Sequence, residues 1–172
     1  ISDRLLSLYP LPPDIDIRYQ VPFPEVHVQC CYEGSDEMID QYQRVRGFIG
    51  DQLKDCSYTT TELSFESSIV DVLKEKAKTI AIAESCTGSR VSQMITSVPG
   101  SSSVFRCGVV AYSNSSKVDA LGVTDLDLDR YGAVSIPIAE AMATGIRQKS
   151  GSEIGISVTG IAGPGGGSSE KP

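Results

Sequence analysis

The pattern of apolar and polar residues divides the chain into two regions. In the first, apolar residues at Val26, Val28 and Cys30 alternate with His27 and Gln29, which predicts a β-strand. A helical repeat follows, with apolar side chains spaced three or four residues apart at Ile39, Tyr42, Val45, Phe48, Ile49 and Leu53. We therefore expect residues 12–60 to form a small module of strand and helix.

The second region begins after the polar stretch YTTTELS, which we interpret as a boundary near residues 57–64. Short apolar runs then alternate with longer amphipathic segments, and the runs predict strands near 79–84, 107–112 and 153–159. Ser64 and Ser135 stand where serine caps the start of a helix. Strands separated by helices predict a layered α/β domain with a largely parallel sheet.

Composition excludes several functional classes. Hydrophobic residues make up 40% of the 172 residues, enough for a core, and neither a membrane-spanning run nor a signal peptide is visible. The net charge is −7, and residues 1–66 carry 12 acids against 5 bases, whereas residues 67–172 carry 10 of each. An acidic front region repels phosphate backbones, so we expect no nucleic-acid partner. Because no run is long enough to span a membrane, we expect no membrane partner either.

One short motif points the other way. The sequence GFIG, from Gly47 to Gly50, has the Gly-x-x-Gly spacing with which KH modules clamp a nucleic-acid backbone. Phe48 and Ile49 continue the apolar repeat of the predicted helix, so we interpret the match as a coincidence within a packed helix.

The cysteines and the histidine limit the chemistry further. The chain has five cysteines, an odd number, and no Cys-x-x-Cys pair, which predicts unpaired thiols, no zinc site and a cytoplasmic location. His27 is the one histidine, so a Ser-His-Asp triad would have to use it.

The first candidate site is the stretch AESCTGSR. A predicted strand ends at Glu84 and Ser85, and a helix is expected to begin near Thr87 and Gly88. Open α/β sheets bind ligands at such strand-to-helix turns, where free amides can hold an anion or stabilise an oxyanion. Ser85 is therefore placed for nucleophilic work. The alternative is a helix-capping cluster without chemistry.

The stretch VVAYSNSSK repeats this arrangement. Tyr112 and Ser113 end the next predicted strand, and Lys117 lies on the turn that follows. Without a nearby histidine, a desolvated lysine can serve as the base for a serine, although a single lysine is more commonly solvated on the surface. Cys86 is a second possible nucleophile, or a small buried side chain.

The third candidate stretch is VTGIAGPGGG. It matches neither the phosphate-binding P-loop nor the Gly-x-Gly-x-x-Gly fingerprint, but Thr159 and Gly160 follow a predicted strand as Ser85 and Tyr112 do. Polar residues after three strands should meet at one edge of the sheet, where glycine lets the backbone approach a ligand closely.

These motifs are similar to those of a known family. AESCTGS, VPGSSSVFRCGVVAYSNSSKVDALGV, YGAVS and VTGIAGPGGGSSEKP resemble, in order and spacing, the C-terminal nicotinamide-nucleotide amidase domain of the CinA family, over residues 64–172. FPEVHVQ and its surroundings resemble the KH-like module that precedes that domain in long CinA proteins. Residues 1–11 would then be the end of an upstream domain or a linker.

The resemblance implies an activity and a fold. The activity is hydrolysis of nicotinamide mononucleotide to nicotinate mononucleotide and ammonia in pyridine nucleotide salvage, by a homodimer without metal or other cofactor. The fold is a three-layer α/β/α sandwich around a mixed, largely parallel sheet, preceded by a small α+β module. Because family members continue beyond SSEKP, the resemblance also implies a fragment at both ends, for which a non-catalytic nucleotide-binding or scaffold role is the alternative.

The resemblance also assigns roles to residues. Ser85 or Thr87 would attack the carboxamide carbon, and Lys117 and Tyr112 would handle the proton. The family usually has two glycines where this chain has Gly88 and Ser89. Substrate binding would fall to Glu84, Gly88, Arg106, Thr159, Gly160, Ala162 and Gly163.

Overall fold

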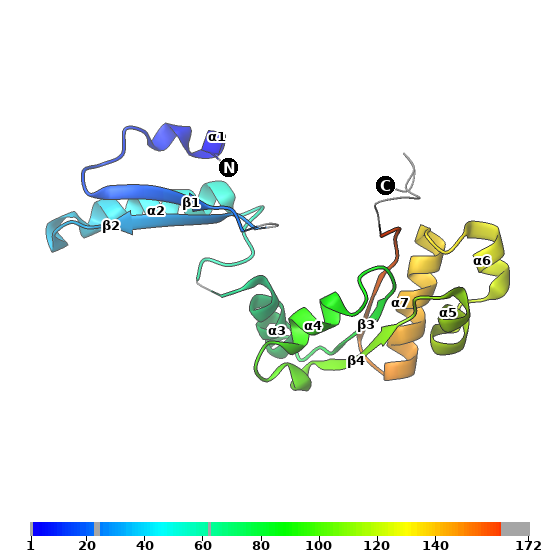
Figure 1. Cartoon of the computed structure of the whole chain (residues 1–172). Coiled ribbons are helices and arrows are strands. Elements are labelled where there is room, and N and C mark those ends of the chain that lie inside the picture. Colours follow the sequence, from blue (N-terminus) through cyan, green and yellow to red (C-terminus); the bar gives the residue numbers. More distant parts are fainter. Residues whose placement is uncertain (1, 23–24, 62, 163–172) are drawn as a thin grey trace. The chain divides into compact units, whose positions relative to one another are not determined.

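The computed structural model describes residues 2–22, 25–61 and 63–162. The chain divides into two compact units, Ile1–Glu62 and Leu63–Pro172 (Figure 1). We describe each unit by itself.

The first unit is a two-stranded antiparallel sheet with one long helix against it. Strand β1 (Ile15–Gln20) pairs with β2 (His27–Tyr32), so that Ile15 faces Tyr32 and Gln20 faces His27. The predicted helix is confirmed as α2 (Ile39–Leu53), and both Gly47 and Gly50 lie inside it. Short elements precede and link these: α1 (Ser2–Leu5) and the 3-10 turns Leu6–Leu8 and Asp36–Met38.

The core of this unit follows the two-residue repeat of a strand and the three- to four-residue repeat of a helix. Alternate residues of β1 meet every third or fourth residue of α2, because one face of each element is apolar. The sequence analysis did not single out β1, although Ile15 and Ile17 alternate as a half-buried strand requires. The buried members are Leu5, Ile15, Ile17, Val45, Ile49 and Leu53.

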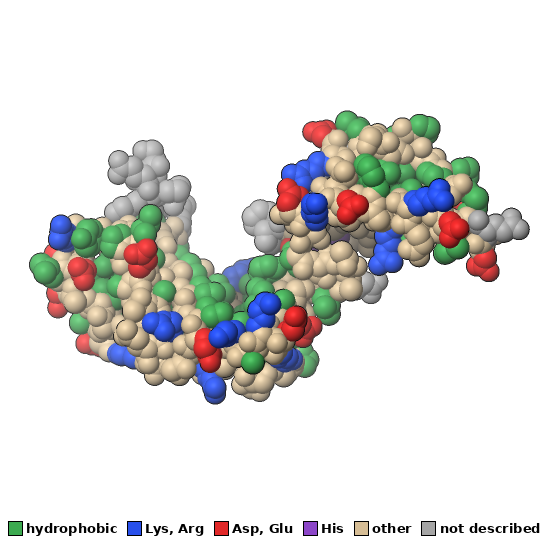
Figure 2. All heavy atoms as spheres, turned by 180° about the vertical axis from the view of Figure 1, so that it is seen from behind, with side chains coloured by type: hydrophobic (Ala, Val, Ile, Leu, Met, Phe, Trp, Pro, Cys, Tyr) green, Lys and Arg blue, Asp and Glu red, His purple; other side chains and the backbone are tan. Residues whose placement is uncertain are grey.

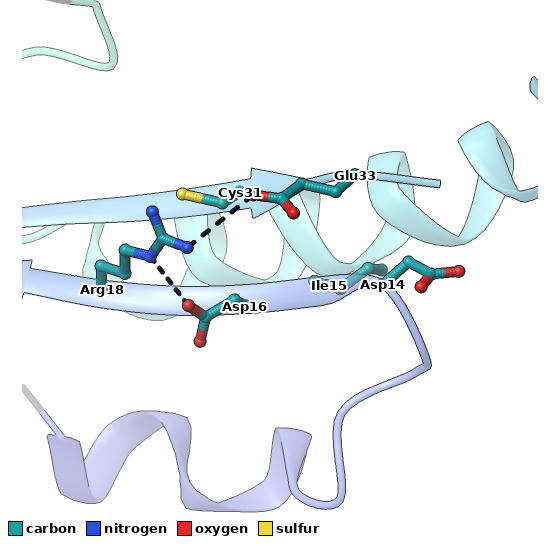
Figure 3. A pocket seen from close by; sticks show the side chains of 6 residues that line it. All are labelled: Asp14, Ile15, Asp16, Arg18, Cys31 and Glu33. Atoms are coloured by element: carbon teal, nitrogen blue, oxygen red, sulfur yellow. Dashed lines mark hydrogen bonds and ion pairs between the residues drawn. The ribbon is translucent and has the colours of Figure 1, made fainter. Parts of the chain in front are cut away.

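The solvent-facing side of β1 and β2 carries a cluster of charges. The Arg18 guanidinium donates to the Asp16 carboxylate at 2.8 Å and lies 3.9 Å from the carboxylate of Glu33. Figure 3 shows both contacts, with Cys31 beside them. These residues line a recess of about 170 Å³, but the charges already pair with one another and are exposed. Acidic and basic side chains are also interspersed over the face of this unit seen in Figure 2.

The second unit is built on a three-stranded sheet in the order β4-β3-β5. Strands β3 (Ile80–Glu84), β4 (Phe105–Val110) and β5 (Ile154–Val158) lie where the sequence predicts them, with β4 beginning two residues early. Both strand pairs are parallel, and the described strands include no antiparallel partner for this sheet. Parallel pairing brings the carboxyl ends of all three strands to one edge.

Helices cover both faces of the sheet, which gives the expected three layers (Figure 1). Helices α3 (Phe65–Glu75) and α4 (Arg90–Thr96) pack on one face, with the 3-10 turn Ser101–Ser103 after α4. Helices α5 (Asn114–Leu121), α6 (Asp125–Tyr131) and α7 (Ile136–Ser150) pack on the other. The predicted caps are confirmed: the Ser64 and Ser135 hydroxyls accept backbone N–H bonds at the starts of α3 and α7.

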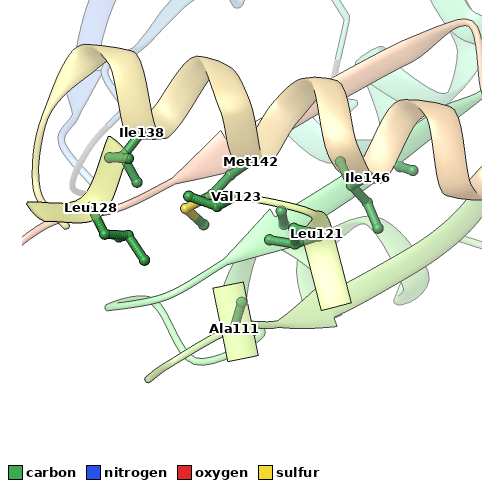
Figure 4. Close-up of a cluster of buried hydrophobic side chains, with 9 residues drawn as sticks. Ala111, Leu121, Val123, Leu128, Ile138, Met142 and Ile146 are labelled. Carbon is green, nitrogen blue, oxygen red and sulfur yellow. The ribbon is translucent and has the colours of Figure 1, made fainter. Parts of the chain in front are cut away.

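The side chains on the two faces of β3 differ in size. Ile80 and Ile82 point into the cluster beneath α3 and α4, whereas Ala81 and Ala83 face α7. The alanines leave room for the side chains that α5, α6 and α7 contribute (Figure 4). That cluster includes Ala111, Leu121, Val123, Leu128, Ile138, Met142 and Ile146.

Two further observations concern the cysteines and the helices of the described residues. All five cysteines are free thiols, as the sequence analysis predicts. Within the described ranges, no helix is both long enough and apolar enough to cross a membrane.

The contact between α7 and α5 depends on Gly145. A Cβ at this position would lie 1.9 Å from the backbone oxygen of Leu121, so the two helices could not keep their separation. We predict that Gly145→Ala lowers the free energy of unfolding by about 1–3 kcal/mol, the usual cost of overpacking, or more. Urea denaturation measures this change.

Gly47→Ala is the matched control, because Gly47 is also helical but has nothing within 4 Å of the added Cβ. This substitution should instead raise the free energy of unfolding by about 0.5–1 kcal/mol. Equal effects of both variants would contradict the close approach of α5 and α7.

Candidate active site

The carboxyl end of β3 is the centre of the site. The Glu84 carbonyl oxygen accepts a bond from the Ala111 N–H at 2.8 Å, and the Ser85 N–H donates to the Val158 carbonyl at 2.9 Å. Residues 84 and 85 therefore join the ends of β4 and β5. The segments that follow these two strands consequently lie on either side of Ser85.

Lys117 reaches Ser85 from α5. The helix begins with a capping box in which Ser113 and Ser116 satisfy each other's backbone N–H groups, so its first turn is fixed. Lys117 is 2% exposed and its Nζ lies 3.2 Å from Ser85 Oγ. The amine also donates to two backbone carbonyls, Ala111 O at 3.0 Å and Tyr112 O at 3.2 Å.

Burial changes the chemistry of this amine. Desolvation lowers the pKa of Lys117 below its ordinary value, and the opposing electrostatic influence of Cys86 is smaller. Among the residues that the structure describes, no carboxylate forms an ion pair with Lys117. The protonated amine thus lacks the counterion that would keep a buried charge stable.

The three hydrogen-bond partners of Nζ can accept from all three N–H groups of an ammonium, and they also fit a neutral amine. A neutral lysine has two N–H donors and one lone pair, and the surroundings of Nζ offer two carbonyl oxygens and one hydroxyl. With the Ala111 and Tyr112 carbonyls accepting the two donors, the lone pair is left for the proton of Ser85. The arrangement can therefore activate a serine hydroxyl without histidine.

Glu84 occupies the other side of the same strand end. Its side chain is fully buried and accepts bonds from Val91 N at 3.0 Å, Ser92 N at 2.8 Å and Ser92 Oγ at 2.6 Å. Burial by itself raises the pKa of the Glu84 carboxyl, but bonds from Ser92, Thr87 and the two backbone amides outweigh it, so the pKa falls below its ordinary value.

The turn between β3 and α4 is shaped by its own backbone. The Gly88 N–H donates to the Ser85 carbonyl at 3.1 Å, so this amide is engaged within the turn. Thr87 Oγ1 is buried and makes no well-formed hydrogen bond within the described ranges, although it lies close enough to Glu84 to help lower that pKa. Ser89 has φ +76°, which explains why glycine suits this position.

A pocket of about 140 Å³ opens beside Ser85 and Lys117. Thr159 fixes one wall, because its hydroxyl donates to the Ala133 carbonyl at 2.9 Å. Gly160 passes so near Cys86 that an added Cβ would lie 3.1 Å from the sulfur. The lining residues are Ser85, Cys86, Tyr112, Asn114, Lys117, Ala133, Val134, Thr159, Gly160 and Ala162.

Most of the predicted residues meet in this pocket, but not all. Glu84, Thr87 and Gly88 lie beside Ser85 in the chain without lining the pocket. Arg106 lies at the opposite end of the sheet, as the extra residue of a bulge at the start of β4, and its side chain is exposed. Gly163 lies outside the described residues.

The sequence analysis missed three lining residues. Asn114 precedes Lys117 by about one helical turn, so helical spacing could have placed both on one face of α5. Ala133 and Val134 join α6 to α7 and belong to the stretch YGAVS, which resembles the family, but their apolar side chains mark no chemistry. They enter the site because Thr159 binds that segment.

Comparisons with known proteins agree with this fold. Residues 62–172 match the family model described as the CinA C-terminal domain. A CinA-like protein of Rippkaea orientalis is 48% identical over 115 residues, which covers 67% of this chain and 28% of that protein. A CinA-like protein of Chloroherpeton thalassium is 40% identical over 163 residues, covering 94% of this chain and 37% of that protein.

A solved structure is similar as well. The competence/damage inducible protein CihA from Agrobacterium tumefaciens is 42% identical, with a TM-score of 0.60, over 62% of this chain and 65% of that chain. The present chain spans well under half the length of the two CinA-like relatives.

From the lowered pKa of Lys117 we predict how the free energy of unfolding changes with pH. The protonated amine destabilises the folded state in full below its lowered pKa, and this cost disappears as the pH rises toward the ordinary value of 10.5. Compared with Lys117→Met, which carries no charge, the native protein should therefore gain stability across that window.

Urea denaturation of both proteins at a series of pH values from 7 to 10.5 measures the difference. Other groups titrate in the same range, but they are common to both proteins and cancel. Two parallel curves would show that Lys117 is not desolvated in solution.

Proposed function

Since its residues 62–172 match the CinA C-terminal domain, the chain belongs to the CinA family, and we propose that its second unit is a serine–lysine amidohydrolase. The observation that carries the proposal is the buried pair of Lys117 Nζ and Ser85 Oγ, 3.2 Å apart, at the edge of a pocket. The similarity of its motifs to the family supports nicotinamide mononucleotide as the substrate, with nicotinate mononucleotide and ammonia as products.

The first half of the reaction uses Lys117 as the base. Its neutral amine removes the Ser85 proton while Ser85 Oγ bonds to the carboxamide carbon, which gives a tetrahedral oxyanion. The Ala111 and Tyr112 carbonyls hold Nζ in place throughout. They also stabilise the ammonium that forms, because they accept its N–H groups.

The second half releases both products. The tetrahedral intermediate collapses, its carbon–nitrogen bond breaks, and Lys117 returns its proton to the departing nitrogen as ammonia leaves. Ser85 then carries an ester of the pyridine carboxylic acid. A water molecule gives its proton to Lys117 and attacks the ester carbon. The bond to Ser85 Oγ then breaks, Lys117 passes the proton to this oxygen, and the acid leaves.

The geometry favours Ser85 over the other nucleophiles. Lys117 Nζ bonds to the Ser85 hydroxyl, whereas Thr87 Oγ1 is turned away from the pocket lining, beside Glu84. Cys86 lines the pocket, but its sulfur faces Gly160. Tyr112 holds Lys117 through its backbone carbonyl, and its side chain, 70% exposed at the rim, is placed to contact substrate rather than to move the proton.

The size of the pocket agrees with recognition of one chemical group. At about 140 Å³ it is smaller than the roughly 300 Å³ of the smallest pockets for drug-sized ligands, and a carboxamide on a ring fits that volume better than a whole nucleotide. The similarity to the family further supports a cytoplasmic homodimer that needs no metal.

Ammonia release from nicotinamide mononucleotide tests the proposal directly. In the full-length protein, Ser85→Ala and Lys117→Arg should each reduce kcat/KM by at least about 1,000-fold, since arginine stays protonated and cannot act as a base. Lys149→Arg is the matched control, because Lys149 also donates to a backbone carbonyl, Asp119 O, but lies outside the pocket.

Full activity of Ser85→Ala would contradict the assigned nucleophile. Tight binding of the nucleotide without ammonia release in the native protein would instead favour a non-catalytic binding module.

The pH dependence of the reaction supplies a separate prediction. Because the neutral form of Lys117 is the base, kcat/KM should rise with pH through the lowered pKa of Lys117, with a midpoint below 10.5. Steady-state ammonia release between pH 6 and pH 10.5 would locate this midpoint. A rate that falls over the same interval would require the protonated amine and would overturn the base assignment.

A further inference from the structure

We infer that Glu84 is a positioning residue, whose buried carboxylate fixes the turn of residues 85–89 and so sets Ser85 against Lys117. The inference rests on the proposed amide hydrolysis but assigns Glu84 a role other than contact with substrate. It differs from the substrate-binding role that the resemblance to the family implies for Glu84.

Glu84 joins the two elements on either side of the turn. Its backbone ends β3, and its carboxylate binds the first turn of α4 through Val91 N, Ser92 N and Ser92 Oγ. These amides are donors that a helix leaves unpaired at its start, and an N-cap side chain normally accepts them. Ser89, the N-cap residue of α4, makes no such bond, so Glu84 supplies the cap from the neighbouring strand.

The turn itself needs this attachment. It reverses the chain with two consecutive residues of positive φ, Gly88 at +56° and Ser89 at +76°, and a side chain rarely adopts that backbone conformation. Its first residue is Ser85, which must remain within hydrogen-bond distance of Lys117. Without the carboxylate, α4 and the turn would lose their link to the sheet at this point.

The ionised form of Glu84 is the one that fits. One carboxylate oxygen accepts both bonds from Ser92, and the other accepts the bond from Val91 N. A glutamine has the same shape but only one acceptor, so its NH₂ group would face a backbone N–H. The lowered pKa of Glu84 agrees with a site that holds the charged form.

Strand β4 leaves room for the bond between Ser92 and Glu84. At Gly108 of β4, an added Cβ would lie 2.6 Å from Ser92 Oγ, so only glycine leaves room for the hydroxyl that bonds to Glu84. Helix α4 donates bonds to the Glu84 carboxylate, and β4 leaves the space that one of these bonds needs. The contacts of Glu84 are therefore part of how the sheet and α4 pack, and they are not an incidental surface contact.

Glu84 is also placed away from substrate. Successive side chains of a strand point to opposite faces, so Glu84 continues the α3 and α4 side of β3, while Ser85 continues the α5 and α7 side. Glu84 is fully buried and does not line the pocket. Its effect on the reaction must therefore pass through the position of Ser85.

The chain contains a matched control at the opposite end of β3. Glu153 likewise accepts bonds from a backbone N–H, at 2.8 Å from Thr79 N, and from a hydroxyl, that of Thr79. Its pKa is lowered, mainly by the Thr79 hydroxyl bond. Glu153→Gln removes the charge of a similar tie between β3 and β5 without touching the turn that carries Ser85. Both Thr79 bonds go to one carboxylate oxygen of Glu153, so the amide oxygen of glutamine can keep them.

The experiment compares Glu84→Gln with Glu153→Gln in the full-length protein, well below the melting temperature of each. We expect Glu84→Gln to lower kcat for nicotinamide mononucleotide by about 10- to 100-fold with KM changed by less than about threefold, because misplacing a reacting group by about 1 Å has effects of this size. Glu153→Gln should keep the native kcat even where it lowers the melting temperature.

Two kinetic outcomes would overturn the inference. A raised KM with an unchanged kcat would mean that Glu84 binds substrate. A kcat and KM both equal to those of Glu153→Gln would mean that Glu84 contributes only stability. If Glu84→Gln does not fold, Ser92→Ala removes one bond to the carboxylate and keeps both amides, and it should lower kcat in the same direction by a smaller factor.

Hydrogen exchange separates this inference from the proposed function. Amides of residues 85–92 should exchange faster in Glu84→Gln than in the native protein or Glu153→Gln, whatever reaction the site performs. If the native protein released no ammonia but exchange changed in this way, the proposed function would fail while the positioning role survived. Unchanged exchange in residues 85–92 would reject the positioning role.

Discussion

The buried amine of Lys117 is the feature on which the second unit depends most. An ammonium group without a carboxylate partner is costly inside a protein, and the cost is reduced when the group loses its proton. Two backbone carbonyls and the Ser85 hydroxyl complete the surroundings of this amine. These partners come from the ends of β3 and β4 and from the segment that follows β4, so the sheet must keep its register for the amine to remain where it is.

Two carboxylates with different tasks fasten the ends of the central strand. Glu153 ties the start of β3 to β5, and Glu84 ties its end to α4. In both cases the acceptor meets backbone N–H groups that would otherwise lack a partner, and the pKa of each carboxyl is lowered. The difference is position: only the second tie lies next to Ser85, which is why we assign it a part in the reaction.

Much of this organisation could be predicted from the sequence. Local patterns fix the elements, because apolar spacing distinguishes strands from helices and serine caps mark where α3 and α7 begin. Parallel order then predicts that Ser85, Tyr112 and Thr159 meet at one edge of the sheet, and the pocket contains all three. The motifs also identify the family, which the match of residues 62–172 shows.

Only the tertiary structure shows which contacts each residue makes at that edge. Sequence order places Glu84 beside Ser85. Only the packing of α4 shows that the Glu84 carboxylate accepts bonds from backbone amides of that helix, because these amides lie seven and eight residues further along the chain, beyond a turn. Arg106 belongs to a motif that resembles the family, yet it lies at the start of β4. The start of a strand is at the opposite end from its carboxyl end, where the pocket lies. Whether Lys117 is solvated or buried also depends on how α5 docks against the sheet. A sequence determines which elements form, whereas desolvation and distance arise only when those elements pack.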